Sequence, residues 1–472
     1  MPNLDDLFAY PPGGDSARDA FCRFLASPRY ILSVMLLTAL SNLFGCELIV
    51  YTLFIGIAVY TCLWGKDLLP LAPLVFSSYI APSIANNPGR NPDSIFSPAK
   101  GGVLLLFLAA LLIAVLILHM IRHRQRFFSR KPKLLSGMLF LAAAYLLSGI
   151  GSDAYPGSLG PNLLFAFLQG CALIVPYWVL WHGVDWKYVR KDYFCWIGFA
   201  TGCVLVIEIL GVYFSGKVIV NGVIERQNIY TGWGMYNNMG GMLAMMLPFA
   251  FYLATKYRKG WIGTVVGSVF LIGILLTCSR TSIITGFCAY IACILLTLRH
   301  GKHRKSNSLA LIIICGCLLL AFILFHKPLL RLFSKLLELG ADPSNRDTIF
   351  QDGLGIFKEY PLLGGSFFSP GKKPWDWSNV DSFSAFFPPR WHNTFVQLLA
   401  TCGIVGLLAY LSHRIQTVKL FYWKRSRENS FIGISLLILL ICSQFDCHFF
   451  NIGPVLFYSM ALAFTERLRT EK

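Results

Sequence analysis

The chain alternates long apolar runs with short polar connections. About fourteen runs approach the roughly 20 residues that an α-helix needs to cross a bilayer, and they are apolar all round rather than on one face. They fall at 30–45, 47–65, 68–86, 102–121, 134–152, 162–182, 194–214, 238–255, 262–279, 282–298, 308–326, 394–412, 431–446 and 452–466. The run at 68–86 holds three prolines, and a re-entrant hairpin is the alternative for the short pair at 30–65. The pattern predicts an all-α polytopic membrane protein with about 14 transmembrane helices.

The composition agrees with this prediction and argues against a soluble protein. Hydrophobic residues make up 56% of the chain, charged residues 14%, and mean hydropathy is +0.60, whereas soluble domains carry about 25% charged residues. The chain has 14 cysteines, most of them inside apolar runs and none in a C-x-x-C pair. We therefore expect neither a zinc site nor a disulfide framework.

The charge pattern predicts the orientation. The net charge is +18, and basic residues gather in connections that alternate along the chain, at 122–133, 185–191, 256–260, 299–305 and 413–427. Because cytoplasmic loops carry the excess of Lys and Arg, these connections and both termini are expected in the cytoplasm. The positive-inside rule thus explains the basic charge, and we expect a lipid bilayer and no nucleic acid as partners. The polar N-terminal stretch has no early apolar core, so the first span would direct insertion.

The opposite face receives a long connection, 327–393, far longer than an ordinary loop. Its stretches PLLRLFSKLLELG and NRDTIFQDGLGIFKEYPLLGG predict short helices, the second closed by Pro361. We divide the chain into a cytoplasmic N-terminal segment (1–29), N-terminal transmembrane helices (30–216), a central region that includes this extracytoplasmic loop (217–412), and C-terminal transmembrane helices with a cytoplasmic tail (413–472).

His392 ends this loop, directly before an apolar run. Histidine titrates near physiological pH and can take a proton from an attacking hydroxyl, so His392 is the candidate general base. The alternative is an interfacial histidine that packs against Trp391 and keeps its polar tip in water. Asn393 beside it, and Asp446 and His448 in a later connection on the same face, are candidate supporting residues.

Three arginines are expected on the same face as His392. Arg280 lies in the corner CSRTS between two spans, Arg226 lies in ERQNIY, and Arg346 opens the helix predicted in SNRDTIF. Each has a local explanation, which is snorkelling for Arg280 and a pair with a neighbouring carboxylate for the other two. Together with a histidine they favour an anion site, because guanidinium groups bind phosphate oxygens in a fork.

The expected anion is a lipid-linked diphosphate. The chain has no glycine-rich nucleotide motif and no outward cluster of carboxylates of the kind that holds Mg²⁺ or Mn²⁺. A diphosphate carried by a membrane lipid fits the location better than a soluble nucleotide. The arginines would neutralise its charge, so we expect no metal and no other cofactor.

These residues carry a family resemblance. RDTIFQDGLGIFKEYPLLGGS followed by WHNTFVQLLATCGIVGLLAYL is similar to the signature of the O-antigen ligase / O-antigen polymerase superfamily. That signature is an arginine opening a helix, a PLLG turn, a variable loop, an HN pair and a GxxG span. SRTSIITG resembles the family's SR motif, and RQNIYTGWGMYNNMGGMLAMMLPF resembles its upstream arginine and NN segment. The resemblance covers about 217–412.

The resemblance implies a GT-C-like glycosyltransferase of the bacterial cytoplasmic membrane with its active site on the extracytoplasmic face. The donor would be a glycan on a polyprenyl (undecaprenyl) diphosphate, and the product a surface polysaccharide such as lipopolysaccharide. His392 matches the family's proposed base, and Arg280, Arg346 and Arg226 match arginines proposed to bind the diphosphate. Transfer would invert the anomeric centre without a metal.

Several alternatives stay open at this stage. The acceptor is a hydroxyl of a glycan, lipid or protein, so ligase, polymerase and protein glycosyltransferase are not distinguished, although the span count leans towards polymerase. A transporter or flippase of lipid-linked glycans would need charged residues within spans, where only Glu47 and Glu208 stand out. A scaffolding protein is a third option, which the ordered arginines and histidine disfavour.

Overall fold

The structure is a computed structural model of the 472-residue chain. It describes residues 17–65, 67–76, 102–128, 131–154, 159–216, 218–220, 223–231, 234–301, 303–317, 319–320, 323, 346–367 and 391–468. The first helix predicted in the long loop falls outside these residues. The second is confirmed as α15 (Arg346–Glu359), which ends one residue before the Tyr360–Pro361 step.

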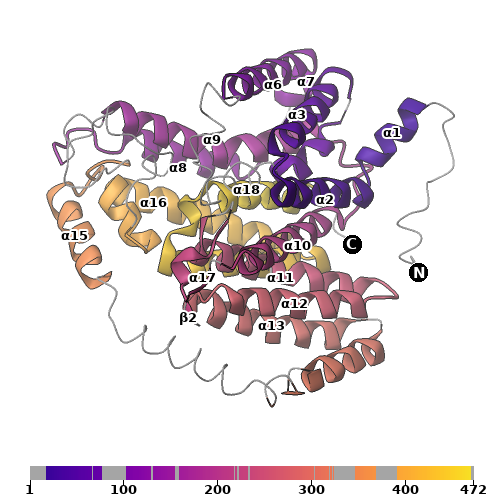
Figure 1. Cartoon of the computed structure of the whole chain (residues 1–472). Helices are drawn as coiled ribbons and strands as arrows, with labels where there is room; N and C mark the ends of the chain where they lie inside the picture. The colour runs from indigo at the N-terminus through magenta and orange to yellow at the C-terminus, as the bar shows by residue number, and fades with distance from the viewer. Residues whose placement is uncertain are drawn as a thin grey trace.

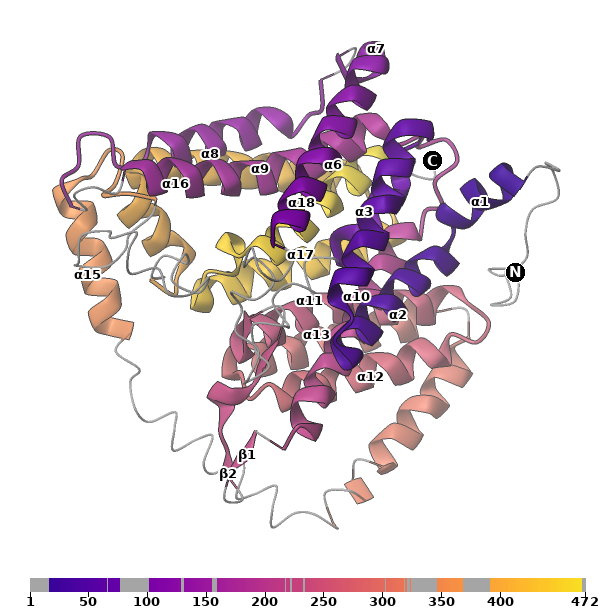
Figure 2. The ribbon, with the colours of Figure 1, turned by 45° about the horizontal axis from the view of Figure 1, so that its top comes forward.

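The described residues form a bundle of α-helices (Figure 1). The other labelled helices are α1 (Ala17–Leu25), α2 (Pro28–Phe44), α3 (Glu47–Trp64), α6 (Gly102–Arg122), α7 (Arg124–Phe128), α8 (Leu135–Leu147), α9 (Leu159–Gly183), α10 (Tyr193–Phe214), α11 (Tyr236–Lys256), α12 (Trp261–Leu276), α13 (Arg280–His300), α16 (Thr394–Trp423), α17 (Arg427–Asp446) and α18 (Ile452–Arg467). Residues 304–317 are helical as well. Figure 2 shows α15 at one end of the bundle and α1 at the other. We call these the α15 end and the α1 end.

Six of the described helices are long and apolar enough to cross a membrane, namely α9, α10, α11, α13, α16 and α17. Shorter apolar stretches of described residues lie in five further helices, α2, α3, α6, α8 and α12. A multi-pass, all-α membrane protein is therefore the architecture, as predicted. The total of about fourteen spans and the GT-C-like arrangement stay predictions.

Helix α11 lies at the centre of the bundle. It is apolar all round, its side chains are almost all buried from Met239 onward, and it packs against α10, α12, α13 and α17. Two adjacent glycines bring other segments close to its backbone. A Cβ on Gly240 would lie 2.7 Å from Ser282 Oγ, and one on Gly241 would lie 2.6 Å from His448 Nε2.

The prediction of a helical span at 68–86 is wrong in its described part. Leu69–Phe76 forms a 3₁₀ helix, η2, instead of an α-helix. Pro70 and Pro73 have no backbone N–H, which removes donors that an α-helix would use. The Pro70 carbonyl accepts a hydrogen bond from the Tyr30 hydroxyl at 3.0 Å, which ties η2 to α2. Residues 77–86 lie outside the described part of the chain.

The basic connection predicted at 413–427 is also wrong over most of its length. Helix α16 continues to Trp423, so His413 and Arg414 lie inside a helix rather than in a loop. A further feature lies in the connection between α10 and α11. It contains two pairs of two-residue antiparallel strands, β1 (Ile219–Val220) with β2 (Val223–Ile224) and β3 (Tyr230–Thr231) with β4 (Gly234–Met235).

Helix α16 is broken at Gly403, where φ is 62° and ψ is −158°. The PLLGG turn that follows α15 fills the break. The Ile404 N–H donates to the Pro361 carbonyl at 2.9 Å, and the Gly365 N–H donates to the Ala400 carbonyl at 2.8 Å. The PLLG and GxxG motifs thus form one joint, which fixes α15 to the first nine residues of α16, the segment 394–402.

Replacing Gly403 by alanine should destabilise this joint. A Cβ there would lie 2.4 Å from the Leu362 carbonyl oxygen, and the positive φ disfavours any L side chain. We expect a loss of about 2–4 kcal/mol in the free energy of unfolding, measured as a lower Tm of the detergent-purified protein. Gly56→Ala is the control, because nothing lies within 4 Å of a Cβ at Gly56. Equal Tm values for both variants would contradict the prediction.

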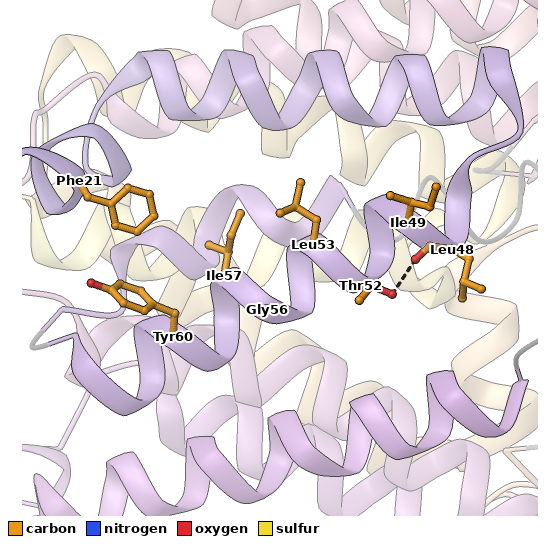
Figure 3. A pocket seen from close by; sticks show the side chains of 8 residues that line it. All are labelled: Phe21, Leu48, Ile49, Thr52, Leu53, Gly56, Ile57 and Tyr60. Atoms are coloured by element: carbon orange, nitrogen blue, oxygen red, sulfur yellow. Dashed lines mark hydrogen bonds between the residues drawn. The ribbon is translucent and has the colours of Figure 1, made fainter. Parts of the chain in front are cut away.

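An apolar groove runs along α3 on the surface of the bundle (Figure 3). Phe21 of α1 and residues from Leu48 to Tyr60 of α3 line it. Apart from Tyr60, Thr52 carries the hydroxyl group of the α3 wall, and this hydroxyl donates to the Leu48 carbonyl at 2.8 Å. Such a surface suits lipid chains, and it lies on helices that contribute no candidate site residue.

Candidate functional site

His392 lies in the turn that begins α16, next to α15. A Cβ on Gly353 of α15 would lie 2.5 Å from Trp391 Cδ1, so α15 packs on the residue that precedes His392. The φ of His392 is 53°, and the chain bends sharply there. Asn393 is the N-cap, and its side-chain oxygen accepts hydrogen bonds from the Phe395 and Val396 N–H groups at 2.8 and 3.1 Å. The cap leaves the His392 ring just outside the helix.

The His392 ring is paired with a carboxylate from the end of α17. His392 Nδ1 lies 2.8 Å from Asp446 Oδ1, and the two side chains are 35% and 16% exposed. A carboxylate facing Nδ1 favours the neutral tautomer that carries its proton there and leaves the lone pair on Nε2. A partly exposed histidine held in this way can act as a general base.

Further hydrogen bonds fasten the start of α16 to the end of α17 around this pair. The Asn393 amide donates to the Gln444 carbonyl at 3.1 Å, and the Thr394 hydroxyl donates to the Ser443 carbonyl at 2.8 Å. Both use carbonyls in the last turn of α17, which an isolated helix would leave without a partner. The position of His392 relative to Asp446 is thus fixed from both helix ends.

His448 lies behind the pair and is only 2% exposed. It is the first residue of the 3₁₀ helix η7 (His448–Phe450), and its ring packs against Gly241 of α11. Its Nδ1 has no hydrogen-bond partner among the described residues. Burial lowers the pKa of His448, against the opposing attraction of Asp446. The ring is therefore neutral near pH 7 and sits where a substrate cannot reach it.

Arg280 and Arg226 lie close to one corner, 278–282, which we call the arginine corner. Arg280 is the first residue of α13 and is exposed. The Arg226 guanidinium carbon, from the 3₁₀ helix η4 (Arg226–Asn228), lies 5.2 Å from the centre of the Tyr236 ring. Burial raises the pKa of the Cys278 thiol, and the nearby Arg226 charge opposes that shift. Among the described residues, neither arginine forms an ion pair with a carboxylate.

The first turns of α11 stand between the arginine corner and the turn that carries His448. The two glycines of α11 face these two segments. Asn238 on the same turns accepts a hydrogen bond from the Asn451 amide at 2.8 Å. The NN and GG pairs of the predicted motif thus connect the two parts of the site. Within the described residues, no hydrogen bond or ion pair joins either arginine directly to His392.

Arg346 begins α15, as predicted, but its side chain lies outside the described part of the structure. Its helix is held at two points, on Trp391 through Gly353 and through a hydrogen bond from the Tyr360 hydroxyl to the Asp153 carboxylate. That bond lowers the pKa of Asp153. Helix α15 is therefore positioned next to His392, while a diphosphate-binding role for Arg346 stays a prediction.

Two features of the site did not follow from the sequence. Asp446 is close to His448 in the chain, yet its partner is His392, 54 residues earlier. Gln397 was overlooked, although a polar residue one turn into an apolar run is a usable signal. It is 1% exposed, and its oxygen accepts from the Trp391 N–H at 3.1 Å and from the Cys447 thiol at 3.7 Å. It thus connects the turns on either side of the pair.

In the described part of the chain, no three histidine, cysteine or carboxylate side chains gather as a metal site would require. The predicted independence from metal is not tested by this and stays a prediction.

Comparison with known proteins finds a family similarity in the middle of the chain. Residues 266–411 match the family model described as O-antigen ligase, which confirms the resemblance to the O-antigen ligase / O-antigen polymerase superfamily. The matched region includes Arg280, Arg346 and His392, whereas Arg226 and Asp446 lie outside it. No curated protein matches the chain.

Proposed function

We propose that this chain, an O-antigen ligase-type membrane glycosyltransferase by its family region, moves a glycan from a polyprenyl-diphosphate donor to an acceptor hydroxyl. The observation that carries the proposal is the His392–Asp446 pair, with Nδ1 held 2.8 Å from the carboxylate and a third of the ring exposed. A base of this kind is what an attacking hydroxyl needs near neutral pH. The family match supports a lipid-linked glycan as donor.

The proposed site faces the extracytoplasmic side of a bacterial cytoplasmic membrane. Helices α11 and α13 begin beside the site, and the basic connections 256–260 and 299–305 follow their far ends. A helix of 21 residues, such as each of these, is about 30 Å long, close to the thickness of the bilayer core. The positive-inside rule then supports a cytoplasmic α1 end and an extracytoplasmic α15 end.

The reaction is a single displacement. His392 Nε2 takes the proton of the acceptor hydroxyl while the hydroxyl oxygen forms a bond to the anomeric carbon of the donor. The bond between that carbon and the diphosphate oxygen breaks, and its electron pair leaves with the diphosphate. Asp446 stabilises the imidazolium that results. Attack on the face opposite the leaving group inverts the anomeric centre.

Arg280 and Arg226 are proposed to bind the leaving diphosphate, with Arg346 added from α15. Negative charge grows on the diphosphate as its bond to the sugar breaks, and cations already in place stabilise that charge without a metal. The donor spans the two parts of the site, because its diphosphate binds at the arginine corner and its first sugar lies at His392. The first turns of α11 form the floor between them.

His392→Ala should abolish this transfer. Loss of a general base costs roughly 10²- to 10⁴-fold in rate. The purified protein, in nanodiscs, is given a polyprenyl-diphosphate glycan and an extract of bacterial surface glycolipids, and release of polyprenyl diphosphate is measured. His300→Ala is the matched control, an exposed histidine at the far end of α13.

The products of the wild-type protein identify the acceptor class. A ladder of lengthening lipid-linked glycan means a polymerase, and intact transfer to another lipid means a ligase. Intact transfer to a protein means a protein glycosyltransferase. Movement of the donor across the bilayer with no release of polyprenyl diphosphate, equal in wild type and His392→Ala, would contradict the proposal and favour a transporter.

A further inference from the structure

Arg414 is an arginine inside an apolar helix, where the sequence suggested a cytoplasmic loop. It lies eleven residues after the break at Gly403, which is about 16 Å along a helix that rises 1.5 Å per residue. A charged side chain within a span is costly and usually has a function. Among the described residues no carboxylate pairs with Arg414, so an ion pair does not explain it.

Three aromatic rings surround the Arg414 guanidinium. Its central carbon lies 4.6 Å from the Tyr410 ring centre, 4.3 Å from that of Phe449 and 4.7 Å from that of Tyr458. These rings come from α16, η7 and α18. Its Nε and Nη2 atoms are buried without a hydrogen-bond partner in the described part of the structure. The three rings, together with a side-chain hydrogen bond to Tyr410, therefore hold this cation.

Two of these rings lead to the two halves of the His392–Asp446 pair. Phe449 belongs to η7, the turn that directly follows Asp446 and Cys447. Tyr410 packs edge-to-face on Phe395, which is three residues after His392, with ring centres 6.1 Å apart and planes at 90°. The guanidinium thus contacts one ring next to Asp446 in the chain and one ring that packs beside His392.

We infer that Arg414 is a positioning residue for the His392–Asp446 pair, an inference that rests on the proposed function of that pair. Its flat cation stacks on Phe449 of the η7 turn and on Tyr410, which itself packs on Phe449 and on Phe395 of the segment 394–402. It thereby keeps the η7 turn against that segment. That contact holds Asp446 within hydrogen-bond distance of Nδ1. An arginine suits this place because a planar guanidinium stacks on several rings at once, which a lysine ammonium or an aliphatic chain does not do equally well.

The test is a double-mutant cycle with Asp446→Asn in nanodiscs. Arg414→Met should lower kcat by about 10-fold or more and leave the donor KM unchanged. In the Asp446→Asn background the same change should cost less than about 2-fold, because the pair it positions is already lost. Arg414→Lys should resemble Arg414→Met if planar stacking is what matters.

Two further variants make the test specific. If Arg414→Met does not fold, Phe449→Leu takes its place. This change removes one ring but leaves the arginine, so it should give the same pattern of kcat losses with a smaller loss. Arg425→Met is the matched control and should leave kcat unchanged, because Arg425 is exposed and stacks on Tyr422, at 4.5 Å, near the opposite end of α16.

The outcomes separate this inference from the proposed function. Equal losses for Arg414→Met in the wild-type and Asp446→Asn backgrounds would overturn the positioning role, as would an unchanged kcat in folded Arg414→Met. If Asp446→Asn itself leaves the rate unchanged, the proposed base pair fails, and the inference about Arg414 fails with it.

Discussion

Asp446→Asn should reduce glycan transfer by roughly 10²- to 10⁴-fold, with little change in donor affinity. Asp446 contributes one hydrogen bond, at 2.8 Å, to His392 Nδ1. It is isosteric with asparagine, so the fold is retained and the loss reports on chemistry. The expected result is a fall in kcat, measured as release of polyprenyl diphosphate at saturating donor.

The size of this effect follows from the tautomer of His392. A carboxylate accepts only, so it fixes the proton on Nδ1 and leaves Nε2 free to act as base. The asparagine amide also offers N–H donors, and donation to Nδ1 moves the ring proton to Nε2, where it blocks the attacking hydroxyl. Raising the pH does not restore the base, because the wrong tautomer is already neutral.

An exposed carboxylate away from the site provides the control. Asp185, in the basic connection 185–191, is exposed and accepts a hydrogen bond from the Lys187 N–H. Asp185→Asn removes the same charge and should change the rate by less than about 3-fold, in line with the small effect of exposed charges. A loss below about 10-fold for Asp446→Asn, or full recovery of its rate at high pH, would contradict the assigned role of Asp446.

Hydrophobic length predicted the helical architecture, because each long apolar run must form a helix to satisfy its backbone within a membrane. The same criterion failed where local chemistry opposed it. Two prolines convert Leu69–Phe76 to a 3₁₀ helix, and three aromatic rings keep Arg414 within α16. The number of charges near Arg414 predicts a loop there. The rings that cover Arg414 come partly from η7 and α18, which are distant in sequence, so the sequence around Arg414 does not reveal them.

The site was predictable where it lies in a short motif. HN gives both the partly exposed imidazole and the N-cap, since Asn393 caps α16 directly. Asp446 and Gln397 were not predictable as partners, because their contacts depend on how the ends of α16 and α17 meet. The role of the glycines of PLLGG and GxxG was not predictable either, because it also depends on how two helices meet. They look like helix-packing residues, yet Gly403 has a positive φ where α15 and α16 join.

Arg280→Met should lower kcat/KM by roughly 10²- to 10³-fold, because the leaving diphosphate loses a cation that is present before reaction. Arg280 is exposed and has no carboxylate partner among the described residues, so its charge is available to a ligand. Arg280→Lys should recover part of the rate, since lysine keeps the charge but lacks the planar fork that holds two phosphate oxygens.

Binding measurements distinguish a diphosphate contact from an effect on folding. Polyprenyl diphosphate, the released product, should bind more weakly to Arg280→Met than to the wild-type protein, whereas the corresponding polyprenol, which lacks phosphate, should bind both equally. Arg299→Met is the control, an exposed arginine in the last turn of the same helix. Unchanged affinity for the diphosphate with a reduced rate would mean that Arg280 acts only in the transition state. Unchanged affinity and rate together would remove Arg280 from the site.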